Sequence, residues 1–233
     1  IRRRALERGE ETPLATAGHT IHFDGIKDLA RDKNSTKYLL KGTDDMFLNG
    51  IDKSQGINEM HGLLDGIMKG RDMIVSFYCL GPVGCEFSIY VVQLTDSYYV
   101  AHSENLLYRN GYVGIRSAKP RDFFRFVHSA GELDENNTSK NTAKRRMYID
   151  LDDNIVYSVN TQYAGNTVGL KKLALRLSIN KAAGEDWLSE HMFLMGVGGK
   201  SGRKTYFTGA FPSACGKTST SMLQGESIVG DDI

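Results

Sequence analysis

The sequence predicts an α/β protein, with a mixed β-sheet domain over residues 1–150 and the beginning of a second, phosphate-loop domain over residues 151–233. Runs such as "MIVSFYCL" and "SIYVVQL" are rich in β-branched and aromatic residues and are separated by glycine and proline, which is typical of strands joined by turns. Farther on, "GKT" stands between two apolar runs, the second of which ends in two aspartates. The order strand, loop, helix and strand is typical of a phosphate-binding loop.

One helix and several strands are predicted before residue 163. Strands are expected at residues 73–80, 88–94 and 98–103, and again at 147–151 and 155–160. The polar, asparagine-rich stretch at residues 131–146 predicts a surface loop or a join between subdomains. The segment "GINEMHGLLDGIMKG" predicts a helix packed on the sheet, because apolar residues recur at helical spacing at Ile57, Met60, Leu63, Leu64 and Ile67.

The second domain is expected to open with the turn-prone loop "YAGNTVG" and a helix whose apolar face includes Ala174 and Leu177. Lys171 and Lys172 are expected in the first turn of that helix. The helix dipole disfavours cations there unless an anion or a metal complex compensates for it. The runs "HMFLMGV" and "KTYFTGAF" predict two strands joined by the turn "GGKSGR".

Composition excludes several classes of protein. The 233 residues are 40% apolar and 24% charged, as in globular proteins, and a net charge of +1 provides no overall field for nucleic acid. Three cysteines without CxxC spacing argue against a disulfide framework and a cysteine zinc site. The apolar runs are too short to cross a bilayer, and the charged start lacks the apolar core of a signal peptide. These features predict a cytoplasmic protein, and the two chain ends suggest a fragment of a longer one.

The phosphate loop is a partial match to the consensus GxxxxGKS/T. Lys217 would reach the outer phosphates and Thr218 a metal ion, but Phe211 stands where the first glycine is expected. A plain strand–turn–helix corner is the alternative. Asp231 and Asp232 could reach a divalent ion bound to the phosphates, or could form an ordinary polar strand end.

Other candidate residues also have an ordinary alternative. Cys215 lies beside Lys217 and a helix start, which favours a reactive thiolate, although an inert buried thiol fits too. His19 and His22 with Asp24 have suggestive spacing, but a metal site there is the less favoured interpretation. The remaining histidines before residue 131 show no constellation of metal ligands: His61, His102 and His128.

The stretch "FPSACGKT", followed shortly by "GDDI", resembles the kinase loops of the phosphoenolpyruvate carboxykinases, in the GTP-type lineage that includes a pyrophosphate-dependent branch. In the same order, "YAGNTVGLKKLALR" resembles the family's loop with paired lysines, and "WLSEHM" resembles its metal-histidine segment. "MKGRDM", "LGPVG" and "VQLTDSYYV" resemble its N-terminal domain, and "KDLARDK" the segment that carries a substrate arginine. The resemblance implies an N-terminal substrate-binding domain followed by the truncated start of a P-loop carboxykinase catalytic domain.

The resemblance implies a lyase of gluconeogenesis that reversibly converts oxaloacetate to phosphoenolpyruvate and CO2. Oxaloacetate loses CO2, and the enolate accepts a phosphoryl group from GTP or from pyrophosphate, leaving GDP or phosphate. Both donors stay open, because Ser219 stands where the family usually has asparagine and the stretch to the acidic pair is shorter than usual. The base-binding aromatic residues, like the mobile lid, would lie after residue 233, so the isolated chain is expected to turn over little.

The resemblance also implies roles for individual residues. Arg31 would clamp the substrate carboxylate, and Tyr163 would lie near the departing CO2. Mn²⁺ would be held by Lys172, His191 and Asp232, with Lys171 favouring the neutral, ligating form of its neighbour. Lys217 would neutralise phosphate charge, and Thr218 would bind the Mg²⁺ that accompanies the donor. The donor phosphates would be cradled by Ser213, Ala214, Cys215, Gly216, Lys217 and Thr218, with Asp231 nearby.

Without the resemblance, His191 is an ordinary surface or core histidine, Arg31 a solvated charge and Tyr163 a packing aromatic. A noncatalytic phosphate-binding module or regulatory paralogue is the alternative function. A generic P-loop kinase of small molecules would explain "GKT" and "GDD" but would leave "NTVGLKK" and "WLSEH" unexplained.

Overall fold

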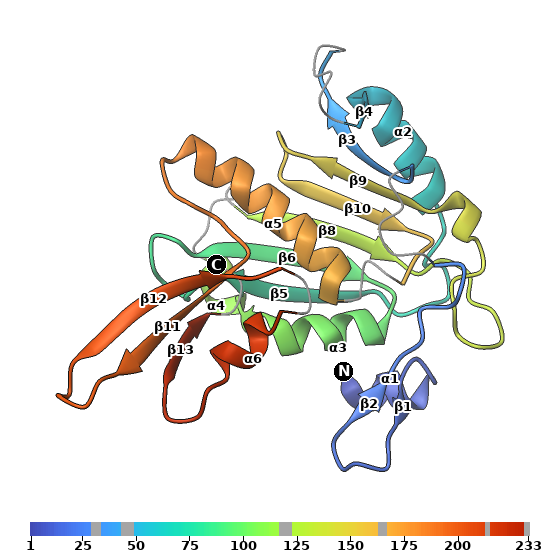
Figure 1. The fold of residues 1–233 in the computed structure, drawn as a ribbon. Coiled ribbons are helices and arrows are strands. Elements are labelled where there is room, and N and C mark those ends of the chain that lie inside the picture. The colour runs from blue at the N-terminus through green and yellow to red at the C-terminus, as the bar shows by residue number, and fades with distance from the viewer. Residues whose placement is uncertain (29–33, 43–48, 117–122, 163–166, 213–214, 231–233) are drawn as a thin grey trace.

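The main element of the computed structural model is a mixed eight-stranded sheet (Figure 1), which confirms the predicted α/β class. The structure describes residues 1–28, 34–42, 49–116, 123–162, 167–212 and 215–230, with side chains omitted at 167–173. From one edge to the other, the strands are β4 (Gly50–Asp52), β3 (Thr36–Leu40), β9 (Arg146–Asp150), β10 (Ile155–Val159), β8 (Phe124–Ser129), β6 (Ile89–Thr95), β5 (Ile74–Leu80) and β7 (Arg109–Asn110). The central strands β10, β8 and β6 are parallel, and the flanking pairs β9/β10 and β5/β6 are antiparallel.

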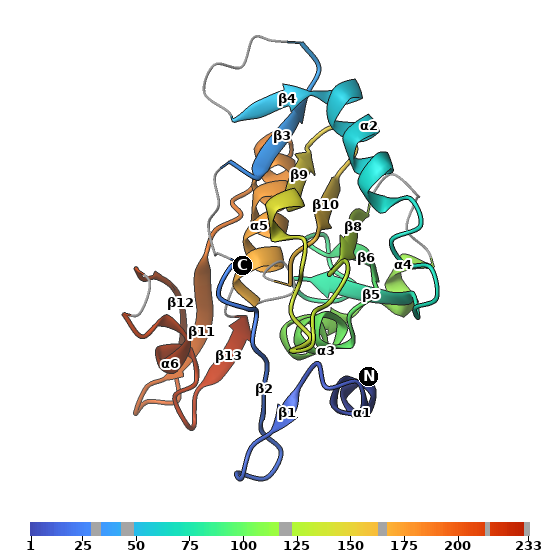
Figure 2. The same cartoon turned by 90° about the vertical axis from the view of Figure 1, so that its right-hand side faces the viewer.

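Helices cover both faces of this sheet. Helices α3 (Tyr98–Leu107) and α5 (Thr167–Gly184) pack on one face, where Val100 and Leu177 join the core formed by the central strands. Helix α2 (Lys53–Leu64) covers the other face near β3 and β4 (Figure 2). Successive side chains of β9 point to opposite faces of the sheet, so this strand contributes to the core on both faces. Tyr148 packs on the face covered by α2, and its neighbour Ile149 packs on the face covered by α3 and α5.

The predicted helix on the sheet is confirmed as α2, with small differences in its bounds. It begins at Lys53, because the carboxylate of Asp52 caps it by accepting a hydrogen bond from the backbone N–H of Gln55 at 3.0 Å. It ends at Leu64. Ile67 therefore lies in the turn that follows, and from there it packs on the apolar cluster that α2 forms with the sheet.

The predicted strand at residues 98–103 is wrong, since this segment forms α3. Ser97 caps the helix by accepting a hydrogen bond from the backbone N–H of Val100 at 3.2 Å. The buried positions are Val100, Ala101, Ser103 and Glu104, which recur with the spacing of a helix face. The aromatic pair at the start of the segment suggested a strand, but the cap and the buried face decide for a helix.

The other four strands predicted before residue 163 are confirmed as β5, β6, β9 and β10. Of the segment 131–146, Arg146 already belongs to β9, and the residues before it connect β8 to β9 within one sheet through a loop that includes a short 3-10 helix, η1 (Thr142–Lys144). The segment is therefore a connection and not a join between subdomains. The domain boundary after residue 150 stays a prediction, and β10 pairs across it with β9.

A small N-terminal arm precedes the sheet. It comprises α1 (Arg2–Glu7) and the antiparallel pair β1 (Thr12–Pro13) and β2 (Thr20–Ile21), and α1 packs on α3. A short helix, α4 (Tyr112–Ile115), follows β7.

The last part of the chain forms a separate antiparallel sheet of three strands in the order β12 (Lys204–Ala210), β11 (Met192–Gly198) and β13 (Ser227–Gly230). The predicted hairpin of two strands is confirmed as β11 and β12. Helix α6 (Lys217–Ser221) lies against β11 (Figure 1). In the part of the chain that the structure describes, no helix has both the length and the apolar character needed to cross a membrane.

Candidate phosphate and metal site

The three-stranded sheet brings three parts of the predicted site to one edge. Strand β11 begins directly after His191, and its first residue, Met192, pairs with Ala210 at the end of β12. Leu194, near the start of β11, pairs with Gly230 at the end of β13. Because both neighbours run antiparallel to β11, His191 lies at the edge where β12 and β13 end. The predicted phosphate loop follows β12 directly, and the predicted acidic pair follows β13 directly.

The described part of the loop makes a tight turn into α6. The backbone N–H of Cys215 donates to the carbonyl of Pro212 at 3.2 Å, and Gly216 precedes the helix with φ of 92°. This is the left-handed region that favours glycine. A Cβ on Gly216 would meet no atom of the described residues within 4 Å, so the turn borders open space. A glycine turn of this kind suits a close approach of phosphate to the backbone.

Phe211 occupies the consensus glycine position for a packing reason. Its ring lies 5.7 Å from the ring of Phe193, which is buried in β11. Phe193 in turn packs against Gly209, where a Cβ would come within 2.5 Å of the ring. The aromatic pair therefore anchors the start of the loop to the sheet.

The side chains around the turn differ in exposure. Lys217 is buried, whereas His191, Cys215 and Thr218 are exposed. The exposed thiol of Cys215 rules out the inert buried alternative, and its reactivity stays a prediction. All three cysteines have free thiols in the structure.

One arginine links this sheet to the larger one. Arg109 in β7 donates through Nη2 to the carbonyl oxygen of Val229 in β13 at 2.8 Å. Its Nη1 donates to the carbonyl oxygen of Gly81, which follows β5, at 3.1 Å. Arg109 therefore fixes the end of β13 relative to the eight-stranded sheet, a role that nothing in the sequence indicates.

The predicted lysine pair lies farther into its helix than expected. Helix α5 begins at Thr167, so Lys171 and Lys172 fall after its first turn. The residues "TVG", which were expected in the preceding loop, belong to that first turn instead. The side chains of Lys171 and Lys172 lie outside the described part, as do the following predicted site residues: Arg31, Tyr163, Ser213, Ala214, Asp231 and Asp232.

The described residues provide part of the donor set that Mn²⁺ and the phosphate-bound Mg²⁺ would need. Among them, no group of three or more histidine, cysteine, aspartate or glutamate side chains is arranged to hold a metal ion. Two of the predicted ligands, His191 and Thr218, have described side chains, and both are exposed. An exposed imidazole beside the strand ends fits a metal site that is completed by ligands from other segments.

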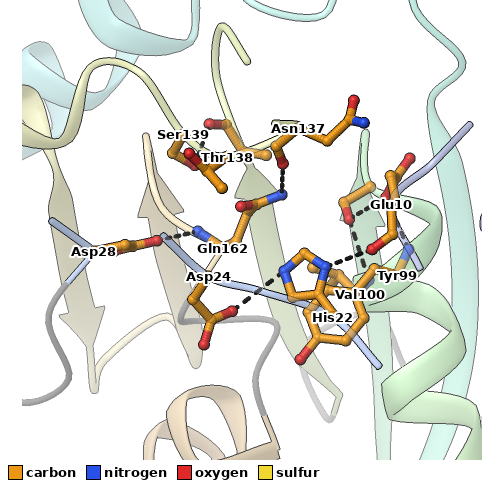
Figure 3. A network of polar contacts seen from close by, with 12 residues as sticks. Glu10, His22, Asp24, Asp28, Tyr99, Val100, Asn137, Thr138, Ser139 and Gln162 are labelled. Carbon is orange, nitrogen blue, oxygen red and sulfur yellow. Dashed lines mark hydrogen bonds and ion pairs between the residues drawn. The ribbon is translucent and has the colours of Figure 1, made fainter. Parts of the chain in front are cut away.

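One histidine of the N-terminal arm, His22, serves a structural role. His22 stacks on Tyr99 with ring centroids 3.5 Å apart, and its Nδ1 donates to the carbonyl oxygen of Glu10 at 2.6 Å (Figure 3). Its Nε2 lies 3.3 Å from the carboxylate of Asp24. The nearby Glu10 carboxylate caps α3, accepting from the hydroxyl of Ser97 and the backbone N–H of Tyr99. This cluster fastens the arm to α3 through His22, and His19 is exposed.

Two family models match the chain and together cover nearly all of it. The model described as the phosphoenolpyruvate carboxykinase N-terminal domain matches residues 1–183. The model described as the phosphoenolpyruvate carboxykinase C-terminal P-loop domain matches residues 187–233.

Three curated relatives illustrate the range of similarity. The chain is 59% identical over 235 residues to a protein of Thermococcus sibiricus and 51% identical over 233 residues to one of Saccharolobus solfataricus, and both alignments cover the whole chain. It is 36% identical over 199 residues, or 79% of the chain, to a protein of Chlamydia pneumoniae. All three relatives are named phosphoenolpyruvate carboxykinase (GTP). The chain spans 38%, 36% and 33% of their respective lengths.

Proposed function

The chain belongs to the phosphoenolpyruvate carboxykinase family, and we propose that the protein of which it is part converts oxaloacetate reversibly to phosphoenolpyruvate and CO2. The observation that carries the proposal is the meeting of His191 with the ends of β12 and β13 at one edge of a sheet. That edge combines a candidate metal ligand with the turn at Gly216. Phosphoryl transfer depends mainly on positioning and charge, which such an arrangement supplies.

GTP is the proposed phosphoryl donor. The curated relatives that cover the whole chain at 51% and 59% identity carry GTP in their names. Pyrophosphate is the competing donor, and the assay below compares the two directly.

The phosphate loop would bind the donor through its backbone and through Lys217. The turn from Cys215 to Gly216 borders open space, where backbone N–H groups can face phosphate oxygens. Lys217 opens α6 and would offset phosphate charge, while the exposed hydroxyl of Thr218 would face the Mg²⁺ that accompanies the phosphates. Asp231, which follows the end of β13 in the sequence, would lie near the donor phosphates and their Mg²⁺.

Three residues would hold the Mn²⁺: Lys172 as a neutral amine, His191 through its imidazole and Asp232 through its carboxylate. When bound, this ion supplies Lewis-acid stabilisation of negative charge on the substrate oxygen. Lys171 would favour the neutral state of Lys172, because two adjacent ammonium groups repel each other. Arg31 would bind the substrate carboxylate through its planar guanidinium, and Tyr163 would line the place that CO2 leaves.

The test is the exchange of labelled bicarbonate into oxaloacetate by the full-length protein, with Mn²⁺ and either GTP or pyrophosphate. We expect exchange with GTP, and a loss of about 10³-fold or more in Lys172→Ala and in His191→Ala, since each removes a metal ligand. Lys181→Ala is the matched control, because Lys181 lies in the same helix and pairs with Glu185 at its exposed end.

Full exchange in both ligand variants would refute the proposed metal site. Exchange that depends on pyrophosphate alone would refute the proposed donor. Binding of phosphates by a wild-type protein that shows no exchange with either donor would identify a noncatalytic phosphate-binding protein instead.

A further inference from the structure

Asp28 joins two distant parts of the chain through a buried carboxylate. Its side chain is 1% exposed, and its Oδ2 accepts a hydrogen bond from the backbone N–H of Gln162 at 2.6 Å (Figure 3). Its Oδ1 accepts from Nη1 of Arg145 at 2.7 Å and from the hydroxyl of Thr161 at 2.6 Å. One side chain thus binds Arg145, which directly precedes β9, and the neighbouring residues Thr161 and Gln162, which follow β10.

The charges in this cluster make the arrangement hard to alter. Arg145 is 4% exposed, so its guanidinium and the Asp28 carboxylate form an ion pair inside the protein. A buried charge that loses its partner is strongly destabilising. The carboxylate therefore cannot leave its position without leaving a buried cation behind.

The segment after β10 to which Asp28 is bonded is itself held by further hydrogen bonds. The carbonyl oxygen of Thr161 accepts a hydrogen bond from Nε2 of His128 at 2.7 Å, and Nδ1 of His128 lies 2.7 Å from the hydroxyl of Thr95. Burial lowers the pKa of His128, which favours the neutral ring that donates through Nε2 and accepts through Nδ1. Gln162 adds a bond from its side-chain amide to the carbonyl oxygen of Asn137 at 2.7 Å.

The segment that contains Asp28 and the segment that contains Gln162 each lead to a residue with a proposed substrate role. In the sequence, Asp28 stands three residues before Arg31, and Gln162 stands directly before Tyr163. We propose that Asp28 is a positioning residue, which holds the chain leading to Arg31 in a fixed relation to the chain leading to Tyr163. The inference rests on the proposed function, because that function gives Arg31 and Tyr163 their roles.

Aspartate suits this position better than its neutral relatives. Its two oxygens accept from a guanidinium, a hydroxyl and a backbone N–H at the same time. Asparagine has the same shape but one acceptor oxygen, so Asp28→Asn would turn an NH2 group toward a donor and remove the negative charge that pairs with Arg145.

A second aspartate provides a matched control. Asp96, whose side chain is also fully buried, accepts from Arg71 at 3.1 Å, from the hydroxyl of Ser129 at 2.6 Å and from the backbone N–H of Ala130 at 2.9 Å. Its donors are of the same three kinds as those of Asp28. Asp96 joins the ends of β6 and β8, and neither end leads directly to a proposed substrate residue.

The kinetic test compares Asp28→Asn, Thr161→Val and Asp96→Asn in the full-length protein, below the melting temperature of each variant. We expect Asp28→Asn to raise the KM for oxaloacetate by about tenfold or more, because misplaced substrate-binding groups lose binding energy. The KM for GTP should stay within about twofold, since the loop at Gly216 belongs to another sheet. Thr161→Val removes one hydrogen bond and keeps the ion pair, so a rise of about threefold is expected. Asp96→Asn should leave the KM for oxaloacetate within about twofold of wild type.

A second readout does not depend on activity. Asp28→Asn should accelerate hydrogen exchange at the backbone amide of Gln162, which loses its charged acceptor, whereas Asp96→Asn should leave that amide unchanged. Provided that the wild-type protein is active, two results would overturn the inference. One is an unchanged KM for oxaloacetate in Asp28→Asn, and the other is an equal rise of that KM in Asp96→Asn. If Asp28→Asn does not fold, a wild-type KM in Thr161→Val overturns it. Absence of wild-type activity would instead refute the proposed function, and the exchange readout would still decide whether Asp28 secures Gln162.

Discussion

The two larger sheets of the molecule have similar strand-forming sequences but very different surroundings. In the eight-stranded sheet, the central strands bury Phe124, Phe126 and Val156 almost completely beneath α3 and α5. In the three-stranded sheet, six of the seven residues of β12 are exposed, and Tyr206 and Phe207 are 59% and 43% exposed. The sheet that carries the phosphate loop thus buries much less apolar surface within the described residues.

This difference places stability and proposed chemistry in different sheets. Burial of apolar surface is the main favourable term in folding, at about 25 cal/mol per Å². The eight-stranded sheet gains this term on both faces, whereas the three-stranded sheet depends on a few β11 residues such as Phe193 and Met195. Ligand-binding segments are often drawn from the less stable parts of a protein.

The sharpest test of the comparison is a pair of matched core truncations. Phe126→Ala should cost about 3–5 kcal/mol of unfolding free energy, because it leaves a cavity under two helices. Phe193→Ala should cost less overall, because its sheet has fewer buried neighbours, but should loosen the phosphate loop through the lost contact with Phe211. Urea denaturation of the full-length protein gives the first quantity, and hydrogen exchange in residues 204–221 gives the second. The comparison would be contradicted if the two variants lost equal unfolding free energy and showed equal hydrogen exchange in residues 204–221.

A buried acid in the larger sheet's core gives a pH-dependent prediction. Glu104 is fully buried, and neither carboxyl oxygen has a hydrogen-bond partner among the described residues. Burial raises the pKa of Glu104 well above its usual value. Because the pKa of Glu104 is higher in the folded state than in the unfolded state, Glu104 stays protonated to a higher pH when the protein is folded. Stability is therefore fully present below about pH 4, the unfolded pKa of glutamate, and is lost as pH rises toward the folded pKa.

Glu104→Met should consequently stabilise the full-length protein by about 1–3 kcal/mol at pH 7, and by less at pH 5. Urea denaturation at both pH values measures this. Leu106→Met, at an exposed position of the same helix, is the control and should have little effect. A variant with no gain at pH 7, or with the same gain at both pH values, would show that Glu104 finds a partner in solution.

The smallest effect is expected at the exposed surface of the three-stranded sheet. Tyr206→Thr keeps a residue that favours strands and removes a ring that is 59% exposed, so it should change stability by less than about 0.5 kcal/mol. Tyr78→Thr, at a position that is 1% exposed in β5, should cost several times more. A large loss in Tyr206→Thr, measured by urea denaturation of the full-length protein, would mean that another part of the protein covers β12.

Local sequence patterns predicted most of the strands but failed where a helix begins with aromatic residues. Period-two burial in β6 and the glycine-rich turn between β11 and β12 are local properties, and both elements were predicted. The helix α3 was missed because Tyr98 and Tyr99 suggested a strand, whereas the cap at Ser97 and the buried Glu104 decide for a helix. Phe211 departs from the loop consensus for a reason, contact with Phe193, that lies in a neighbouring strand.

By itself, the sequence determined the α/β class, the turn at "GKT" and the family, because short-range periodicity and ordered motifs are written in consecutive residues. Only the tertiary structure decided that His191 meets the ends of β12 and β13, that Arg109 bonds to Val229, and that Asp28 holds Gln162. The physical reason is chain separation: strand pairing and buried hydrogen bonds join residues that are up to 134 positions apart, and no local pattern specifies which donor meets which acceptor.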